Sequence, residues 1–402
     1  MTTFSKSFTQ QEPIPEDAIE AAVAVMRSGR LHRYNVLPDE TAEAEKLEAE
    51  FAAYMGASYC LAVTSGGYAI QIALRAAGLK PGDPVLSNAF TLAPVPGAVE
   101  AVGAKSVLVE TASDYCIDLD DLEAKAAASG ARTLLLSHMR GHIVDMDRVM
   151  EICGRYDLTL IEDCAHTMGA DWDGRKSGSF GKAACFSTQT YKHVNSGEGG
   201  FLTTNDPELA ARATIYSGSY MLYGRHGAGP GPEVFDKLRL EVPNMSGRMD
   251  NLRAAMLRPQ LARLDDQCRR WNALYHVLEE GLRNHPQIRL PERPAKEGYV
   301  ASSIQFSLPA FSPEQFQRLL ALCLERGVEL KWFGNPDPNG YTSRFDSWRY
   351  MEVPELPRTL EVLSTMCDMR IPLTFDEEDC RVIAEVVAAA AREVGEDHRA
   401  NG

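Results

Sequence analysis

The feature that most constrains the fold is a regular alternation of short apolar segments with segments of helix length between residues 60 and 204. Apolar runs rich in Val, Leu and Ile, each separated by a helix-length segment, are typical of a mainly parallel sheet that helices bury on both faces. We therefore expect an α/β fold with a mainly parallel seven-stranded sheet. The expected strands cover residues 60–64, 85–87, 106–109, 133–137, 158–162, 183–187 and 200–204.

The pattern changes after Asn205, and we expect a second, smaller α/β domain towards the C-terminus. The expected large domain spans residues 1–250, and the small domain spans residues 251–402, including a long linking helix. Right-handed crossovers should align the carboxyl ends of the parallel strands along one edge, where ligands usually bind. Further expected helices cover 68–77, 146–156, 207–216, 248–282, 313–326 and 377–394, and further strands cover 302–307 and 328–331; residues 226–232 should form a loop or lid.

Composition excludes several classes of protein. The chain of 402 residues has 41 basic and 56 acidic residues, a formal charge of −15, so nucleic acid and anionic membranes are not expected partners. The start of the chain is polar, and no apolar run reaches the roughly 20 residues that span a bilayer, which predicts a cytoplasmic protein. The nine dispersed cysteines have no C-x-x-C spacing, so we expect reduced thiols and no metal site.

Two residues at strand ends are candidates for catalysis. Asp163, in the segment IEDCAH, follows a buried strand, where an ionised carboxylate needs a donor or a cation. It can cap the following turn, or it can pair with a protonated ring nitrogen of a cofactor. Lys192 lies in a polar loop between a strand and the glycines of GEGG, where burial and nearby positive charge would lower its pKa for attack on a carbonyl.

A third motif, TSGGYAIQIAL, begins a helix directly after a strand. Ser65, Gly66 and Gly67 expose backbone N–H groups at the positive end of that helix. This arrangement suits a phosphate group, although ordinary capping by the serine gives the same pattern.

The order of these motifs resembles that of fold-type-I enzymes that use pyridoxal 5′-phosphate (PLP). Several segments are similar to one branch, the DegT/StrS family of sugar aminotransferases, and the resemblance extends from about residue 16 to residue 395. Segments that carry it include LAVTSGGYAIQIALRAAGLKPGDPVL, SHMRGHIVDMDRVMEIC, LIEDCAHTMGADWDGRKSGSFG, FSTQTYKHVNSGEGGFLTTND and LPRTLEVLSTMCDMRIPL.

The resemblance implies a role for each motif. Lys192 would bond covalently to PLP and carry protons, Asp163 would pair with the ring nitrogen, and His166 would lie near the ring hydroxyl. Ser187 and the turn of Ser65, Gly66 and Gly67 would bind the phosphate. The family also forms homodimers, in which a segment of one subunit reaches the neighbour's phosphate.

The chain departs from the family pattern at several of these positions. Gly67 stands where a Thr is usual, and Leu92 stands where an aromatic residue stacks on the ring, with Phe90 close by as a substitute. Ser246 takes the place of the Asn that crosses to the neighbouring subunit, although Asn244 is also available. Arg140 and His142 replace a common Tyr and Gln and are, with His138, candidates for substrate contact.

Other residues have two interpretations. His193 either touches substrate or packs in the loop, and Arg33 with Tyr34 can reach an anionic substrate group or serve structure alone. The aromatic segment from residue 332 to residue 350 forms either a substrate rim or part of the core.

The expected reaction is transfer of an amino group from glutamate or glutamine to a keto sugar or keto cyclitol in sugar-derived biosynthesis. Dehydration or other amino-acid chemistry by a PLP enzyme of the same fold is an alternative, but the dehydratases of this family have His in place of Lys192. A non-catalytic PLP-binding regulatory protein is a second alternative, which the acidic charge and the lack of a DNA-binding motif disfavour.

The sequence predicts that PLP attaches at Lys192. Borohydride reduction of the loaded protein, followed by peptide mapping, should find the label on the peptide that contains Lys192, and Lys192→Ala should abolish it. A label on Lys182, or none, would contradict the assignment.

Overall fold

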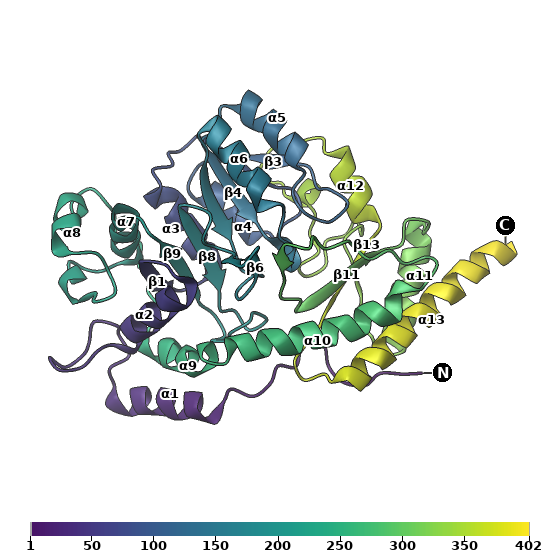
Figure 1. Cartoon of the computed structure of the whole chain (residues 1–402), viewed down its shortest axis with the longest axis horizontal. Helices are drawn as coiled ribbons and strands as arrows, with labels where there is room; N and C mark the ends of the chain where they lie inside the picture. Colours follow the sequence, from purple (N-terminus) through teal and green to yellow (C-terminus); the bar gives the residue numbers. More distant parts are fainter. Residues whose placement is uncertain (1, 402) are drawn as a thin grey trace.

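The first half of the chain is built on a seven-stranded sheet with helices on both faces (Figure 1). A computed structural model describes residues 2–401 of the chain, with side chains to residue 396. The strand order is β1-β9-β8-β5-β4-β2-β3, and β9 is antiparallel to its neighbours β1 and β8. All seven strands that the sequence predicted are present: β1 (Tyr59–Val63), β2 (Pro84–Asn88), β3 (Lys105–Val109), β4 (Thr133–Ser137), β5 (Thr159–Asp163), β8 (Ala183–Ser187) and β9 (Gly200–Thr204).

The two faces of this sheet bury alternate residues of each strand. In β4, Leu134 and Leu136 belong to the core that includes α2, α5 and α6, whereas Leu135 belongs to the core that includes α3, α4 and α7. Burial on both faces explains the continuous apolar runs in the sequence. The helices of this part of the chain are α1 (Glu16–Ser28), α2 (Glu43–Met55), α3 (Gly66–Ala76), α4 (Pro94–Ala101), α5 (Leu119–Ser129), α6 (Met146–Tyr156), α7 (Pro207–Ser217) and α8 (Pro232–Leu238), with the short 3-10 turns η1 (Met139–Gly141) and η2 (Tyr223–Arg225).

Local capping sets where the helices begin. The Ser65 side chain accepts a hydrogen bond from the Tyr68 N–H at the start of α3, and Asp145 accepts from two N–H groups at the start of α6. After α3, Gly78 has a φ of 94°, a left-handed conformation that glycine adopts at little cost. α6 has the bounds that the sequence predicted, and α3 differs by one or two residues at each end.

The smaller sheet has the order β11-β13-β12 and lies in the C-terminal part of the chain. Its strands are β11 (Ser303–Ser307), β12 (Lys331–Trp332) and β13 (Met366–Arg370), with helices α11 (Pro313–Glu325), α12 (Pro357–Ser364), α13 (Glu377–Asn401) and η3 (Phe345–Ser347). The sequence analysis did not predict β13, because Asp368 and Arg370 interrupt its apolar pattern. A third sheet joins β10 (Glu297–Gly298) to β6 (Asp171–Trp172) and β7 (Arg175–Lys176), and so connects the two parts of the chain.

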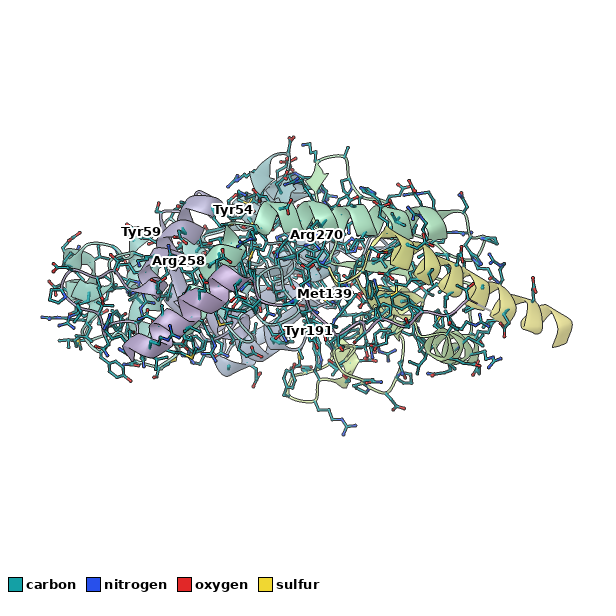
Figure 2. The ribbon with its side chains drawn as sticks, turned by 90° about the horizontal axis from the view of Figure 1, so that it is seen from below. Tyr54, Tyr59, Met139, Tyr191, Arg258 and Arg270 are labelled. Atoms are coloured by element: carbon teal, nitrogen blue, oxygen red, sulfur yellow. The ribbon has the colours of Figure 1, made fainter. Side chains whose placement is uncertain are left out.

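The long helix predicted over residues 248–282 is two helices. α9 (Asn251–Leu261) and α10 (Leu264–Arg283) are separated at Ala262 and Arg263. Pro259 lies inside α9, and a proline there removes one hydrogen bond of the helix and favours a break close by. Seen from below, α10 and α13 pack side by side, and Arg270 on α10 pairs with Glu12 of the N-terminal segment (Figure 2).

The N-terminal segment packs against the C-terminal part of the chain. The rings of Phe4 and Phe8 contact Phe375 edge-on at centroid distances of 5.1 and 5.0 Å, and Lys6 pairs with Asp379. The segment therefore helps to hold the small sheet against the large one. All nine cysteines are buried free thiols. Within residues 2–401, no helix combines the length and apolar character needed to cross a bilayer.

Candidate active site

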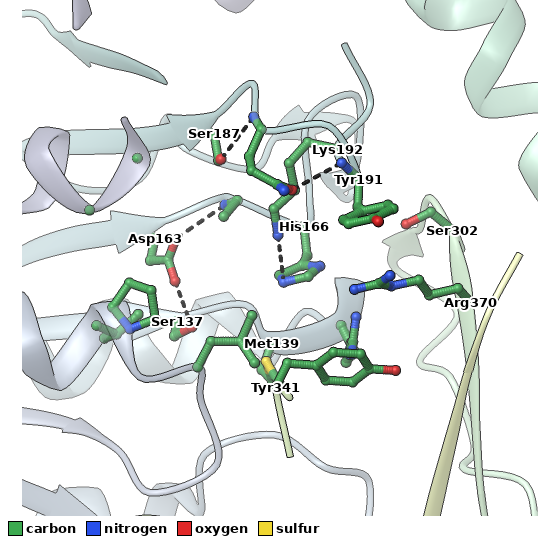
Figure 3. A pocket seen from close by; sticks show the side chains of 18 of the residues that line it. Ser137, Met139, Asp163, His166, Ser187, Tyr191, Lys192, Ser302, Tyr341 and Arg370 are labelled. Atoms are coloured by element: carbon green, nitrogen blue, oxygen red, sulfur yellow. Dashed lines mark hydrogen bonds between the residues drawn. The ribbon is translucent and has the colours of Figure 1, made fainter. Parts of the chain in front are cut away.

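A cavity of about 470 Å³ lies where the carboxyl ends of the large sheet face the small sheet. Ser137, Asp163 and Ser187 are the last residues of β4, β5 and β8, and all three line it. This is the edge at which open α/β sheets bind ligands. Arg370 from β13 lies across the cavity from Asp163 (Figure 3), and Phe8 from the N-terminal segment also lines it, so three distant parts of the chain form its wall.

The start of α3 forms one end of the cavity. Ser65, Gly66 and Gly67 line it, and the first N–H groups of a helix have no partner within the helix. A Cβ on Gly66 would lie 3.0 Å from the Cβ of Ser187 and 3.3 Å from the Phe186 carbonyl oxygen. Gly66 therefore brings this turn close to Ser187, and the N–H groups and the two hydroxyls form a cradle that fits a phosphate group.

Asp163 caps the following turn, which is one of its two interpretations, and also accepts a hydrogen bond from the end of β4. Its Oδ1 accepts a hydrogen bond from the Ala165 N–H at 3.1 Å, which caps the following turn, and its Oδ2 accepts from the Ser137 hydroxyl at 2.8 Å (Figure 3). The residue is buried but lines the cavity. A carboxylate held in this way can pair with a protonated ring nitrogen of a bound cofactor.

Lys192 follows β8 and extends into the cavity. Its Nζ lies 3.0 Å from Nε2 of His166 (Figure 3). Burial lowers the pKa of Lys192 to about 7, the nearby charges of Arg140 and Arg370 add to this effect, and Asp163 opposes it. Burial, followed by the charge of Lys192, also holds the pKa of His166 well below its usual value, so the imidazole is neutral. Lys192 is therefore available as an uncharged amine near neutral pH.

Two neighbouring candidates for contact with a cofactor ring lie in different places. Leu92 lines the cavity, whereas Phe90 is not among its lining residues. The Phe90 ring instead packs edge-on against Phe333 at 5.0 Å. An apolar side chain, and not an aromatic one, therefore faces the cavity at this point.

The stretch from His138 to His142 divides between cavity and core. Arg140 lines the cavity and pairs with Asp368 at 2.9 Å. His142 is buried behind it, with Nε2 2.8 Å from the Gln305 side-chain oxygen, and His138 Nε2 lies 3.2 Å from Glu162. Arg140 has a φ of 58°, which turns the chain sharply and places these side chains in different environments.

Glu162, His138 and Cys164 form a buried group of the kind that can bind a metal ion. The Glu162 carboxylate, however, already accepts hydrogen bonds from the N–H groups of Gly178, Phe180 and Gly181 at 2.8 to 2.9 Å. Its oxygens are therefore occupied, and the group anchors the loop between β5 and β8.

Other candidates from the sequence do not line the cavity of this chain. His193 packs edge-on against Trp271 at 5.1 Å, and Arg33 makes a two-pronged ion pair with Glu48 at 2.7 Å. The Tyr34 hydroxyl lies 3.1 Å from Nδ1 of His226. Asn244 and Ser246 are exposed on the loop before α9, where the Asn244 side chain accepts from the Ser246 N–H.

Several lining residues were not among the candidates predicted from the sequence. Ser137, Tyr191 and Arg370 lie within segments that resemble the family, but no role was predicted for them there. Each interpretation of the aromatic segment holds for part of it. Tyr341 lines the cavity, whereas Phe333, Phe345 and Trp348 are buried in the core. For Arg370, the sequence signal that could have indicated a binding role was a single arginine at the end of a strand.

Known proteins resemble this chain in sequence and fold. A dTDP-3-amino-3,4,6-trideoxy-alpha-D-glucose transaminase from Streptomyces venezuelae is 37% identical over 68% of this chain and 67% of its own length. An L-glutamine:2-deoxy-scyllo-inosose aminotransferase from Streptoalloteichus tenebrarius is 30% identical over 94% and 93%. A relative from Micromonospora echinospora is 36% identical over 58% of this chain. The match covers 53% of that relative, so this chain spans about half of the relative's length. The crystal structure of S. venezuelae DesV in complex with a ketimine intermediate has a TM-score of 0.76 and 28% identity, and the match covers 94% of each chain.

The fold and the site define a PLP-dependent aminotransferase of fold type I. The phosphate cradle, the strand-end carboxylate and the buried lysine are the groups that this cofactor requires. Residues 13–388 match the DegT/DnrJ/EryC1/StrS aminotransferase family, and the chain belongs to this family.

The low pKa of Lys192 predicts how the cofactor-free enzyme captures PLP. Because only the neutral amine attacks an aldehyde, the rate should rise with pH through about 7 and level off above it. A lysine with an ordinary pKa near 10.4 would continue to gain about tenfold per pH unit up to pH 10. Stopped-flow absorbance measures the rate, and a midpoint near pH 10 would contradict the structure.

The contacts of Asp163 predict the effect of Asp163→Asn. The amide keeps the size of the side chain but loses the charge that would stabilise a protonated ring nitrogen, so the fold and PLP binding should persist. Proton transfer in the half-reaction with the amino donor should slow by several orders of magnitude. Single-turnover absorbance measures this step, and near-normal rates would assign the role to another group.

Proposed function

We propose that this enzyme transfers an amino group from glutamine or glutamate to the keto group of a sugar or cyclitol. The observation that carries the proposal is the convergence of Lys192, Asp163 and the start of α3 in one cavity of a family member. The activities of two relatives, a dTDP-sugar transaminase and a 2-deoxy-scyllo-inosose aminotransferase, support this range of acceptors.

The residues of the chain divide the work of the reaction. When bound, PLP would supply an electron-withdrawing ring that holds the amino group between the two half-reactions. The Lys192 amine, once free, would take a proton from the donor carbon and return it to the cofactor side. Asp163, oriented by the Ser137 hydroxyl, would keep the ring nitrogen protonated. Neutral His166 would hold the Lys192 amine in position through the contact at 3.0 Å.

The size of the cavity favours a small acceptor. Pockets for single small molecules span about 300–1,000 Å³. The cavity of about 470 Å³ lies in the lower part of this range and must also hold the cofactor, which leaves room for about one sugar-sized ring. Because Arg140 is paired with Asp368 and His142 is buried, ring hydroxyls would be recognised by other lining groups, such as Ser302 and Gln11.

We also propose that the active unit is a cytoplasmic homodimer with shared sites, in which residues 1–250 and 251–402 act as large and small domains. Asn244 and Ser246 do not line the cavity of their own chain, which is the expected position for groups that serve a neighbour. Large apolar side chains are exposed on the same segment, with exposed fractions of 56% for Tyr220, 58% for Met221 and 86% for Leu240. Such exposure is typical of surfaces that a partner covers.

The acceptor proposal is tested by comparing a free keto cyclitol with a nucleotide-linked keto sugar. We expect the free ring ketone to have at least an equal kcat/KM, because the nucleotide would lie outside the cavity. A preference of more than about tenfold for the nucleotide sugar, worth roughly 1.4 kcal/mol, would contradict this choice of acceptor.

The shared site is tested by complementation between two inactive chains. Mixing Lys192→Ala with a chain altered at both Asn244→Ala and Ser246→Ala should restore partial activity, because one site of each hybrid dimer has both halves intact. Hybrid dimers that form without any activity would show that this segment does not serve the neighbouring site.

A further inference from the structure

Arg370 occupies an unusual place in the cavity wall. It is the last residue of β13, and its guanidinium carbon lies 3.9 Å from the centre of the Tyr191 ring and 4.8 Å from that of Tyr341. Figure 3 shows Arg370 beside Ser302, across the cavity from Asp163 and Ser187. The two rings hold the guanidinium with its edge available to the cavity.

The charge of Arg370 is not neutralised by the described part of the chain. No hydrogen bond or ion pair of its guanidinium is found within residues 2–396. Asp368, two residues before Arg370 on β13, is fully buried and already accepts from Arg140 at 2.9 Å, the Tyr341 hydroxyl at 2.8 Å and Gln305 at 2.7 Å. A half-buried cation without a counter-ion is costly, which indicates that a ligand supplies the anion.

The cofactor's phosphate does not fit this role. Ser187, which is suited to a phosphate together with the adjacent start of α3, lies across the cavity from Arg370 (Figure 3). The positive charge of Arg370 also contributes to the low pKa of Lys192 and His166, so an anion bound at Arg370 would lie close to the reacting amine.

We infer that Arg370 is the binding site for a carboxylate group of a substrate, which rests on the aminotransferase function proposed above. The fork of a guanidinium donates two parallel hydrogen bonds to a carboxylate, and ring stacking fixes the plane of the fork in advance. The amino donor has a carboxylate on the carbon that bears its amine, and a ring acceptor can also carry one. The carboxylate can therefore belong to the amino donor or to the ring acceptor, and the experiment distinguishes these two substrates.

The direct test is ligand binding to the holoenzyme. Glutaramate is glutamine without its amino group and keeps the carboxylate, whereas glutaramide carries an uncharged amide in that place. Arg370→Gln should weaken glutaramate binding by at least tenfold, Arg370→Lys should weaken it less, and glutaramide binding should change in neither variant. Arg269→Gln, an exposed arginine on α10, is the matched control and should change nothing. Calorimetry measures the affinities, and cofactor absorbance verifies the fold.

Kinetics identify which substrate carries the carboxylate. If it is the donor, Arg370→Gln raises the donor concentration needed for half-maximal conversion in the first half-reaction. If it is the acceptor, the variant instead weakens use of a carboxylated cyclohexanone relative to a neutral one, with glutaramate unaffected. Equal affinities of wild type and Arg370→Gln for glutaramate and for the carboxylated ketone would overturn the inference. Failure of the wild type to aminate any ring ketone would refute the proposed acceptor, but the binding affinities for glutaramate and for the carboxylated ketone, taken together, would still decide the role of Arg370.

Discussion

The burial of the Lys192 amine among positive charges is the constraint on which the rest of the site depends. An ammonium group loses hydration when it is buried, and Arg140 and Arg370 raise the cost of its charge further. Asp163 offsets part of this cost, so the pKa of Lys192 falls to about 7 and not much lower. Each of these three neighbours must therefore be held firmly, because a small shift of any one would change how much neutral amine is present.

Buried carboxylates hold Arg140 and several of the surrounding segments in place. Glu162 is fixed by three backbone N–H groups and anchors the loop between β5 and β8, while Asp368 joins Arg140 and Tyr341 across the two parts of the chain. Glu48 binds Arg33 and also accepts from the Ala62 N–H at 2.7 Å. A buried charge is tolerated only when it is paired and hydrogen-bonded in this way. Several histidines and arginines that resembled substrate ligands in the sequence thus serve these anchors.

The cavity is shared among segments that are far apart in the chain. The large sheet supplies the strand ends, β13 supplies Arg370, and the N-terminal segment supplies Phe8 and Gln11. The N-terminal segment packs through Phe4 and Phe8 on Phe375, which follows β13, so the side of the cavity formed by these segments is one packed unit. The chemistry on the large sheet and the recognition of substrate on the small one are therefore built from different parts of the fold.

The sequence by itself determined the large sheet and the reactive ends of its strands. Periodicity and capping act over a few residues, so the seven strands, the turn at Ser65 and the positions of Asp163 and Lys192 could be predicted locally. The tertiary structure alone decided which polar residues reach the cavity. His142 meets Gln305 and Arg140 meets Asp368, partners more than 160 residues away, and no local pattern encodes such pairs. For the same reason β13 and Arg370 were missed: their role comes from packing against Tyr191 and Tyr341, and not from the pattern of their own strand.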